Sequence, residues 1–328
     1  MYKERKSILS LLSFFGIILL LLVFESPDFF TLKNFSDIML GSATTIIGAM
    51  GMMLVILMGQ IDVSVGSIFA ICCAVTGVLA KSGMPIPLAV LTAVCAGAAL
   101  GAVNGLLFAV VGIDAIVVTL GMNSIYRGGL ILCTQGAWIT GLPPAILQIG
   151  QGKLLGVPVP VWISLCVFAL LALLLRYTSW GRNLYAIGSN TRAAHLSGIK
   201  VKLTQVSAFA VNGALVAVSA VIYATRFGGV ESNTGQGFEM VFISAAVVGG
   251  VSILGGSGST FGTLLGAILI GTVSTVLIFF KINSYWEQAV EGIIILAAVS
   301  LYQIHGDRIK AFFKREGGNG VEKLGTKG

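Results

Sequence analysis

Ten apolar segments, each close to the length of a membrane-spanning helix, divide this sequence. A helix needs about 20 apolar residues to cross the bilayer, and few charges interrupt these segments. We expect the spans at about residues 8–24, 38–59, 64–80, 88–111, 115–134, 160–175, 204–224, 240–254, 261–280 and 286–304. The sequence therefore predicts an all-α, polytopic membrane helical bundle of about ten transmembrane helices.

The composition excludes a soluble globular chain. Hydrophobic residues make up 56% of the sequence and charged residues only 10%, whereas soluble domains carry about 25% charged residues. Because no long polar stretch separates a second unit, we expect one transmembrane domain over residues 1–328, with its core at about 8–305 and a tail at 306–328. The five cysteines lie in apolar runs, which favours buried packing over metal or redox chemistry.

The net charge of +7 indicates orientation in a membrane rather than a nucleic-acid partner. Most Lys and Arg residues lie in the N-terminal YKERK, in residues 176–202 and in the tail after His305. Such residues gather on the cytoplasmic side of membrane proteins, and the alternation of ten helices puts all three segments there. We therefore predict a cytoplasmic (inner) membrane protein with both termini in the cytoplasm and with residues 135–160 outside.

Residues 176–202 form the longest polar interruption, and they contain five basic residues but no Asp or Glu. Within them, Asn190 is a typical helix-capping residue and Gly198 a typical helix terminator, so 190–198 is predicted to form one short exposed helix. A short basic helix that projects from a membrane body suits docking to a partner better than catalysis.

Sequence signatures of nucleotide binding and catalysis are missing. The G-x4-G-K spacing fails because position 147 is Leu, and GGSGST at 255–260 has no lysine, which favours a turn between helices. No nucleophile–base pair and no metal-ligand spacing occurs. We expect a non-catalytic protein that binds no cofactor directly and draws any energy for uphill transport from elsewhere.

Charged residues inside the apolar segments are few. Asp62 and Asp114 lie at predicted cytoplasmic helix ends, within reach of water, where helix capping is the favoured role. Arg127 is the deepest cation, and it can snorkel outward, pair with a neighbouring helix or line a polar path. Glu287 and Glu291 lie near the outer end of the last segment, which favours an interfacial location over a proton relay. The lack of a chain of carboxylates across the bilayer disfavours an ion-coupled carrier.

Uncharged polar residues are more numerous within the segments and suit a neutral, hydroxylated solute. Each can instead form hydrogen bonds between helices. The candidates for a translocation path are Asn104, Asn123, Arg127, Asn212 and Ser244.

Glycine spacing predicts close contacts between helices. Small residues at every fourth position let helix backbones approach each other in lipid. We expect such faces at Gly97, Gly101 and Gly105 and at Gly258, Gly262 and Gly266. Residues 53–80 and 245–271 also share an apolar–glycine–serine–glycine–apolar order, which indicates either repeated halves or only the similarity of glycine-rich membrane segments.

Several blocks, in fixed order, resemble one family of membrane proteins. These blocks are GQIDVSVGS, VNGLLFAVVGIDAIVVTLGMNSIYRG, GRNLYAIGSNTRAAHLSGIKV and VVGGVSILGGSGSTFGTLLGA. Together they look like the permease subunit of sugar-type ABC importers, the ribose/rhamnose/autoinducer-2 group, over about residues 38–305. WITGLPPAI, SNTGQGFEM and KINSYWEQ look closer to the autoinducer-2 and rhamnose permeases than to the ribose permease.

The resemblance implies a transporter built from several subunits. Two permeases, identical or paired with a sister permease, would form the pore for a small sugar-like solute. Two cytoplasmic ATPases would hydrolyse ATP, and an extracytoplasmic solute-binding protein would deliver the solute. An ion-coupled secondary sugar carrier and a membrane-embedded enzyme are the alternatives, which the lack of ion-coupling carboxylates and of a nucleophile–base pair disfavours.

The resemblance also implies that a short cytoplasmic helix fits a groove on the ATPase. Its small residues would permit close contact, while Arg192 and His195 would face acidic groups on the partner. Related loops carry a Glu-Ala-Ala sequence that is replaced here by Thr191 to Ala194, which leaves the individual contacts open. The docking residues carried over are Asn190, Arg192, Ala193, Ala194, His195, Ser197, Gly198 and Ile199.

Overall fold

The computed structural model describes residues 31–231 and 233–279, together with isolated positions between 286 and 296. The predicted span at 8–24, the N-terminal YKERK and the tail after residue 305 lie outside the described residues. So do Glu287, Glu291 and most of the predicted span at 286–304.

The described chain is a bundle of helices with two very small antiparallel sheets. Strand β1 (Ile139–Thr140) pairs with β4 (Gly229–Val230), and β2 (Lys153–Leu154) pairs with β3 (Val157–Pro158). The helices are α2 (Leu32–Leu57), α3 (Val65–Lys81), α4 (Ile86–Leu106) with its π-helical extension (Leu107–Val111), α5 (Ala115–Thr134), α6 (Pro144–Gln151), α7 (Val159–Tyr177), α8 (Ser179–Ser189), α9 (Thr191–Leu196), α10 (Val201–Phe227), α11 (Phe238–Val248) and α12 (Thr260–Phe279).

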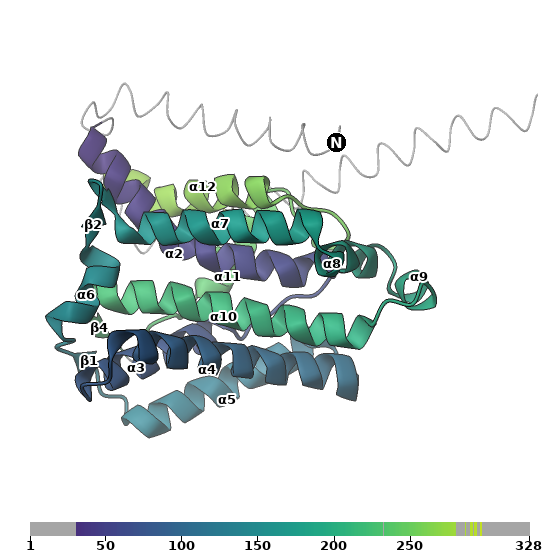
Figure 1. Ribbon diagram of the computed structural model, residues 1–328, viewed down its shortest axis with the longest axis horizontal. Helices are drawn as coiled ribbons and strands as arrows, with labels where there is room; N and C mark the ends of the chain where they lie inside the picture. Colours follow the sequence, from purple (N-terminus) through teal and green to yellow (C-terminus); the bar gives the residue numbers. More distant parts are fainter. Residues whose placement is uncertain are drawn as a thin grey trace, which may run out of the picture.

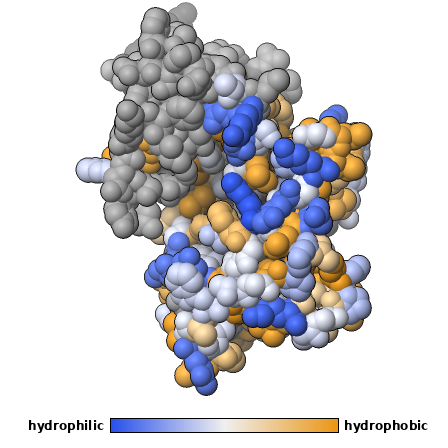
Figure 2. All heavy atoms as spheres, turned by 90° about the vertical axis from the view of Figure 1, so that its left-hand side faces the viewer, coloured by the Kyte–Doolittle hydropathy of each residue, from blue (hydrophilic) through white to orange (hydrophobic). Residues whose placement is uncertain are grey.

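The bundle has two distinct ends. The long helices run side by side, with α8 and α9 at one end and α6 with the strands at the other (Figure 1). We call these the α9 end and the strand end. At the strand end, hydrophilic residues gather among apolar ones (Figure 2), and the Lys81 ammonium of α3 donates to the Thr140 carbonyl of β1 at 2.9 Å. Polar groups at both ends of an apolar body are typical of a membrane protein.

Five described helices are long and apolar enough to cross a membrane, which confirms the all-α membrane class. They cover Lys33–Leu57, Ile86–Val111, Ala115–Thr134, Val159–Tyr177 and Val201–Phe227. Three shorter apolar helices lie among them, so every predicted segment between 38 and 280 corresponds to a helix. The count of ten spans stays a prediction.

One predicted segment is shorter than expected. Residues 240–254 were expected to be helical, but α11 ends at Val248. Gly250, Gly255 and Gly256 adopt left-handed backbone conformations with φ of 88°, 84° and 74°, which a helix cannot accommodate. Residues 249–259 therefore form a loop at the α9 end, and the expected turn at GGSGST is confirmed.

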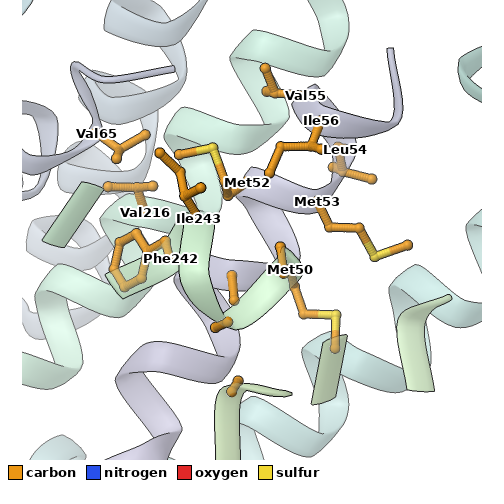
Figure 3. Close-up of a cluster of buried hydrophobic side chains, with 14 of the residues drawn as sticks. Met50, Met52, Met53, Leu54, Val55, Ile56, Val65, Val216, Phe242 and Ile243 are labelled. Atoms are coloured by element: carbon orange, nitrogen blue, oxygen red, sulfur yellow. The ribbon is translucent and has the colours of Figure 1, made fainter. Parts of the chain in front are cut away.

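Helix α2 occupies the centre of the bundle, packed against α7, α10, α11 and α12. From Ser42 to Leu57 all of its residues are buried, as expected for a stretch of helix with no outward face. Figure 3 shows its side chains among residues of neighbouring elements. The fully buried side chains of this cluster include Met50, Met52, Met53, Leu54 and Ile56 of α2 and Val65 and Val216.

The predicted glycine face on α4 is confirmed, and so are Gly262 and Gly266 on α12, whereas Gly258 lies in the loop before α12 and would meet only the side chains of Leu57 and Val251. A Cβ added to Gly101 of α4 would lie 3.3 Å from Gly213 Cα and against the Phe209 carbonyl of α10. A Cβ added to Gly266 of α12 would lie 2.9 Å from Gly249 Cα. Glycine is required at these positions because the backbones themselves are in contact.

Helices α3 and α11 are too short to span the bilayer, and both begin inside the bundle. They contain 17 and 11 residues, which corresponds to about 26 and 17 Å against a hydrocarbon core of about 30 Å. Residues 58–64 run back from the α9 end to the start of α3, and residues 228–237 run in from the strand end to the start of α11. The two starts meet, because a Cβ on Gly66 would lie 2.5 Å from the Gly235 carbonyl and would also contact Glu239.

Candidate functional site

The short helix predicted at 190–198 is present as α9 (Thr191–Leu196). Asn190 caps α9, its Oδ1 accepting from the Ala193 amide at 2.9 Å, and Gly198 follows the helix with a φ of 81°. Both expected boundary signals are confirmed. Helix α8 was not predicted from the sequence. Its residues Gly181, Leu184 and Ile187 are buried against the bundle. Part of the polar interruption is therefore a structural support for α9.

The docking candidates divide into outward and inward side chains. Ala194 is only 5% exposed, and Ile199 packs against the main core. These two residues hold α9 in place and do not face outward. The outward set consists of Asn190, Arg192, Ala193, His195, Ser197 and Gly198.

Leu196 is a surface residue that sequence reasoning missed. Its side chain is 80% exposed at the end of α9, although a leucine of that exposure gains nothing from folding. The available signal was that Leu196 is the one large apolar residue in the polar stretch 190–198. An apolar side chain surrounded by basic residues is suited to a partner surface.

At the α9 end, the end of α2, helix α8 and the loop after α11 approach so closely that their backbones are in direct contact. The Leu57 carbonyl at the end of α2 accepts from the Gly256 amide at 2.9 Å. A Cβ on Gly188 of α8 would collide with that carbonyl, and a Cβ on Gly255 would lie 2.6 Å from the Gly59 amide. The α9 support is therefore in direct backbone contact with the loop that leads to α3.

Deeper in the bundle, that loop ends in a buried polar network centred on Asp62. Asp62 Oδ1 accepts from the Ser64 amide at 3.0 Å and from its hydroxyl at 2.6 Å, while Oδ2 accepts from Asn212 Nδ2 at 3.0 Å. Asn104 Nδ2 donates to Ser64 Oγ at 2.6 Å, and the Tyr126 hydroxyl donates to Asn104 Oδ1 at 3.0 Å. The network ties α4, α5 and α10 to the start of α3.

The two aspartates expected at helix ends differ. Asp114 is exposed and caps α5 by accepting from the Ile116 amide at 2.9 Å, as expected. Asp62 has no exposed surface, so the expectation that water reaches it is wrong. The reason is that residues 58–64 turn back into the bundle instead of ending at the surface.

A second polar group surrounds the shared start of α3 and α11. The Arg127 guanidinium of α5 donates to the Thr234 carbonyl at 2.8 Å and to the Gly66 carbonyl at 3.4 Å. Ser67 of α3 donates to the backbone carbonyl of Asn123 at 2.9 Å and also to its side-chain oxygen. Arg127 therefore joins a neighbouring loop and helix, one of its three expected roles.

The five path candidates do not form one lining. Asn104, Asn212 and Ser244 are fully buried within this chain. Asn104 and Asn212 tie helices together, whereas the Ser244 hydroxyl donates to the Met240 carbonyl of its own helix. Asn123 and Arg127 are half-buried on α5. Only these two reach a surface that a solute or a neighbouring subunit can approach.

An apolar helical body with five candidate spans, two short helices that begin inside it and a projecting basic helix is typical of a multi-pass membrane transport subunit. Residues 34–299 match the family described as "Branched-chain amino acid transport system / permease component". The chain belongs to this permease family. No solved structure matches it.

The relatives are permeases named for one import system. The chain is 37% identical over 300 residues to the "Autoinducer 2 import system permease protein LsrC" of Enterobacter sp. (strain 638), covering 91% of this chain and 86% of the relative. It is 36% identical over 289 residues to the protein of that name from Escherichia coli O157:H7, covering 87% and 84%. For the protein of that name from Salmonella typhi the identity is 38% over 251 residues, covering 76% and 72%.

These matches confirm the resemblance to sugar-type ABC importers. The chain is a non-catalytic permease subunit of an ABC importer and a multi-pass membrane protein. The family match and the relatives therefore favour an importer permease over the alternatives of a membrane-embedded enzyme and an ion-coupled carrier.

Proposed function

We propose that this permease imports a small neutral sugar-like solute, of the autoinducer-2, rhamnose or ribose kind, using ATP hydrolysed by a partner that docks on α9. The support for the solute comes from relatives of 36–38% identity that are named for autoinducer-2 import. The family description names branched-chain amino acids, whereas the individual relatives reported above are all named for autoinducer-2 import. Cofactor binding by the permease itself forms no part of the proposal.

One observation supports the docking proposal: the inner side of α9 packs on the bundle, while its outer side exposes an apolar side chain that has no partner within the described chain. Ala194 and Ile199 hold α9 on the bundle, while Leu196 stands 80% exposed beside Arg192 and His195. Interfaces gain most of their affinity from a few buried apolar or aromatic anchors within a polar rim. A groove with an apolar floor and acidic edges on the ATPase would complement this helix.

The proposed orientation follows from the same assignment. The α9 end would lie in the cytoplasm with both termini, and the strand end would face outward, toward the solute-binding protein. The basic residues of 176–202 support this direction, because Lys and Arg gather on the cytoplasmic side.

We further propose that a second permease, identical or a sister subunit, covers the open side of α5. Gly121, Ser124 and Gly128 are exposed on this helix, and nothing lies within 4 Å of a Cβ on either glycine. Half-buried Asn123 and Arg127 border the same surface. A solute path between two permeases would use these polar groups, because their exposed sides would be costly to place against lipid.

The docking proposal is tested with Leu196→Asp, compared with Leu155→Asp as the matched control. Leu155 is 86% exposed at the opposite end of the bundle. Burying one leucine at an interface is worth about 1.5–3 kcal/mol, so Leu196→Asp is expected to weaken ATPase binding about tenfold to a hundredfold. Co-purification of the co-expressed ATPase and uptake should both fall, while Leu155→Asp stays like wild type.

Equal ATPase binding by wild type and Leu196→Asp would refute docking through α9. Equal losses in both variants would show a general folding defect and would also refute it.

A further inference from the structure

Two opposite charges flank the place where α3 and α11 begin. Arg127 lies on α5, 12 residues beyond its first residue, and Glu239 lies in the first turn of α11. The rise of a helix puts Arg127 about 18 Å along α5 and about 10 Å from its end at the strand side. Charged groups at such depth are expensive in a membrane and are functional candidates.

The backbone holds both charges in fixed positions. Two N–H groups of Arg127 bond to the carbonyls of Thr234 and Gly66. The Glu239 carboxylate lies against Gly66 at the start of α3, since a Cβ on Gly66 would collide with it. A guanidinium has five N–H groups and a carboxylate about four lone-pair sites, so each group keeps unused hydrogen-bonding capacity.

The two charges interact electrostatically but are not joined by a hydrogen bond in the described part of the chain. Both side chains are half-buried, so each keeps some exposed surface. Helices α5 and α11 approach the same end of α3 without packing extensively against each other. The arrangement is a donor and an acceptor held apart, each with an accessible side.

The chemistry of this pair selects among solutes. Arginine can only donate hydrogen bonds and a carboxylate can only accept them, whereas a hydroxyl group does both. A polyhydroxylated neutral molecule satisfies both groups at once. A singly charged solute would be attracted by one member of the pair and repelled by the other, so its charge brings no net advantage over a neutral hydroxylated solute.

We propose that Arg127 and Glu239 together contact the solute during transport and select neutral, hydroxyl-rich molecules. This rests on the proposed function of solute import, and it adds Glu239 to the path and a substrate preference to the pair. A zwitterionic amino acid, with a carboxylate for Arg127 and an ammonium for Glu239, is the competing ligand class.

The decisive variant is Glu239→Gln in the assembled permease–ATPase complex. The substitution keeps the size and the hydrogen-bonding oxygen of the side chain, so the fold is expected to persist. Binding of radiolabelled autoinducer-2 to the complex is measured without the solute-binding protein, whose own affinity would otherwise set the apparent value. Arg127→Lys and Arg127→Met are measured alongside, with Lys81→Met as the control for losing a cation that bonds to a distant carbonyl.

We expect Glu239→Gln and Arg127→Met to weaken autoinducer-2 binding about tenfold or more, the loss of one charge-assisted hydrogen bond. Arg127→Lys should lose less, and Lys81→Met nothing. Unlabelled ribose should compete for the site and leucine should not. Thermal stability and ATPase assembly should stay at the wild-type level in Glu239→Gln.

Wild-type binding in Glu239→Gln would overturn the solute-contact role, as would an equal loss in Lys81→Met. Competition by leucine and not by ribose would overturn the preference for neutral solutes. If the wild-type protein assembles with no ATPase, the proposed function itself fails, which is a separate outcome from failure of the pair.

Discussion

Replacing Asp62 by leucine is expected to destabilise the bundle strongly. Three hydrogen bonds end on this carboxylate, from the Ser64 amide, the Ser64 hydroxyl and Asn212 Nδ2. Asp62→Leu leaves the Ser64 amide, the Ser64 hydroxyl and the Asn212 amide without these acceptors at a position with no exposure. Each unsatisfied buried group costs about 1–3 kcal/mol, so the total is about 3–9 kcal/mol.

Asp62→Asn should cost far less, because Asn212 can compensate. The Asn212 Oδ1 atom is buried and has no hydrogen-bond partner. If the Asn212 amide turns over, this oxygen accepts from the new amide at position 62, whose own oxygen still serves Ser64. One hydrogen bond between neutral groups replaces one to a carboxylate, which costs about 1 kcal/mol.

Thermal unfolding of the purified protein in detergent measures the difference. For a chain of this length, 1 kcal/mol shifts Tm by about 2 °C, so Asp62→Leu should unfold about 6–18 °C lower and Asp62→Asn about 2 °C lower. Asp114→Leu serves as the control, since it removes only an exposed cap worth about 1 kcal/mol. An unchanged Tm in Asp62→Leu, or equal losses for leucine and asparagine, would refute this account of the network.

Two further predictions test the packing and the orientation. Gly213→Leu should abolish folded protein in size-exclusion profiles, because its Cβ would lie 3.2 Å from Gly101 Cα and against the Gly97 carbonyl. Gly41→Leu, where nothing lies within 4 Å of an added Cβ, should leave the profile unchanged. In a cysteine-free background, Leu155→Cys should react with an impermeant maleimide from outside the cell and His195→Cys should not. Equal profiles for the two glycine variants would contradict the packing argument, and reversed labelling would contradict the orientation.

Much of the bundle could be predicted from periodicity and composition. The span expected at 115–134 coincides with α5, and the glycine series on α4 and α12 lie at backbone contacts. These features depend on local sequence, since hydrophobic length and small-residue spacing act within one helix. The cap at Asn190 and the terminator at Gly198 were predictable for the same reason.

The site was less predictable because it depends on where loops turn. Nothing local indicates that residues 58–64 and 228–237 fold back into the bundle, so the burial of Asp62 and the position of Glu239 could not be foreseen. The same limit applies to α9, where Ala194 faces inward and Leu196 outward. In a helix of six residues, a rotation of about half a turn decides which side chains a partner meets.

ATP-dependent uptake by purified components tests the central claim most directly. Proteoliposomes would contain the permease with its ABC ATPase, and the solute-binding protein would be added outside with radiolabelled autoinducer-2. The account predicts uptake only when ATP is available to the ATPase, with no effect of ionophores that collapse ion gradients. Uptake by the permease alone that needs no ATP and stops on addition of an ionophore would contradict it.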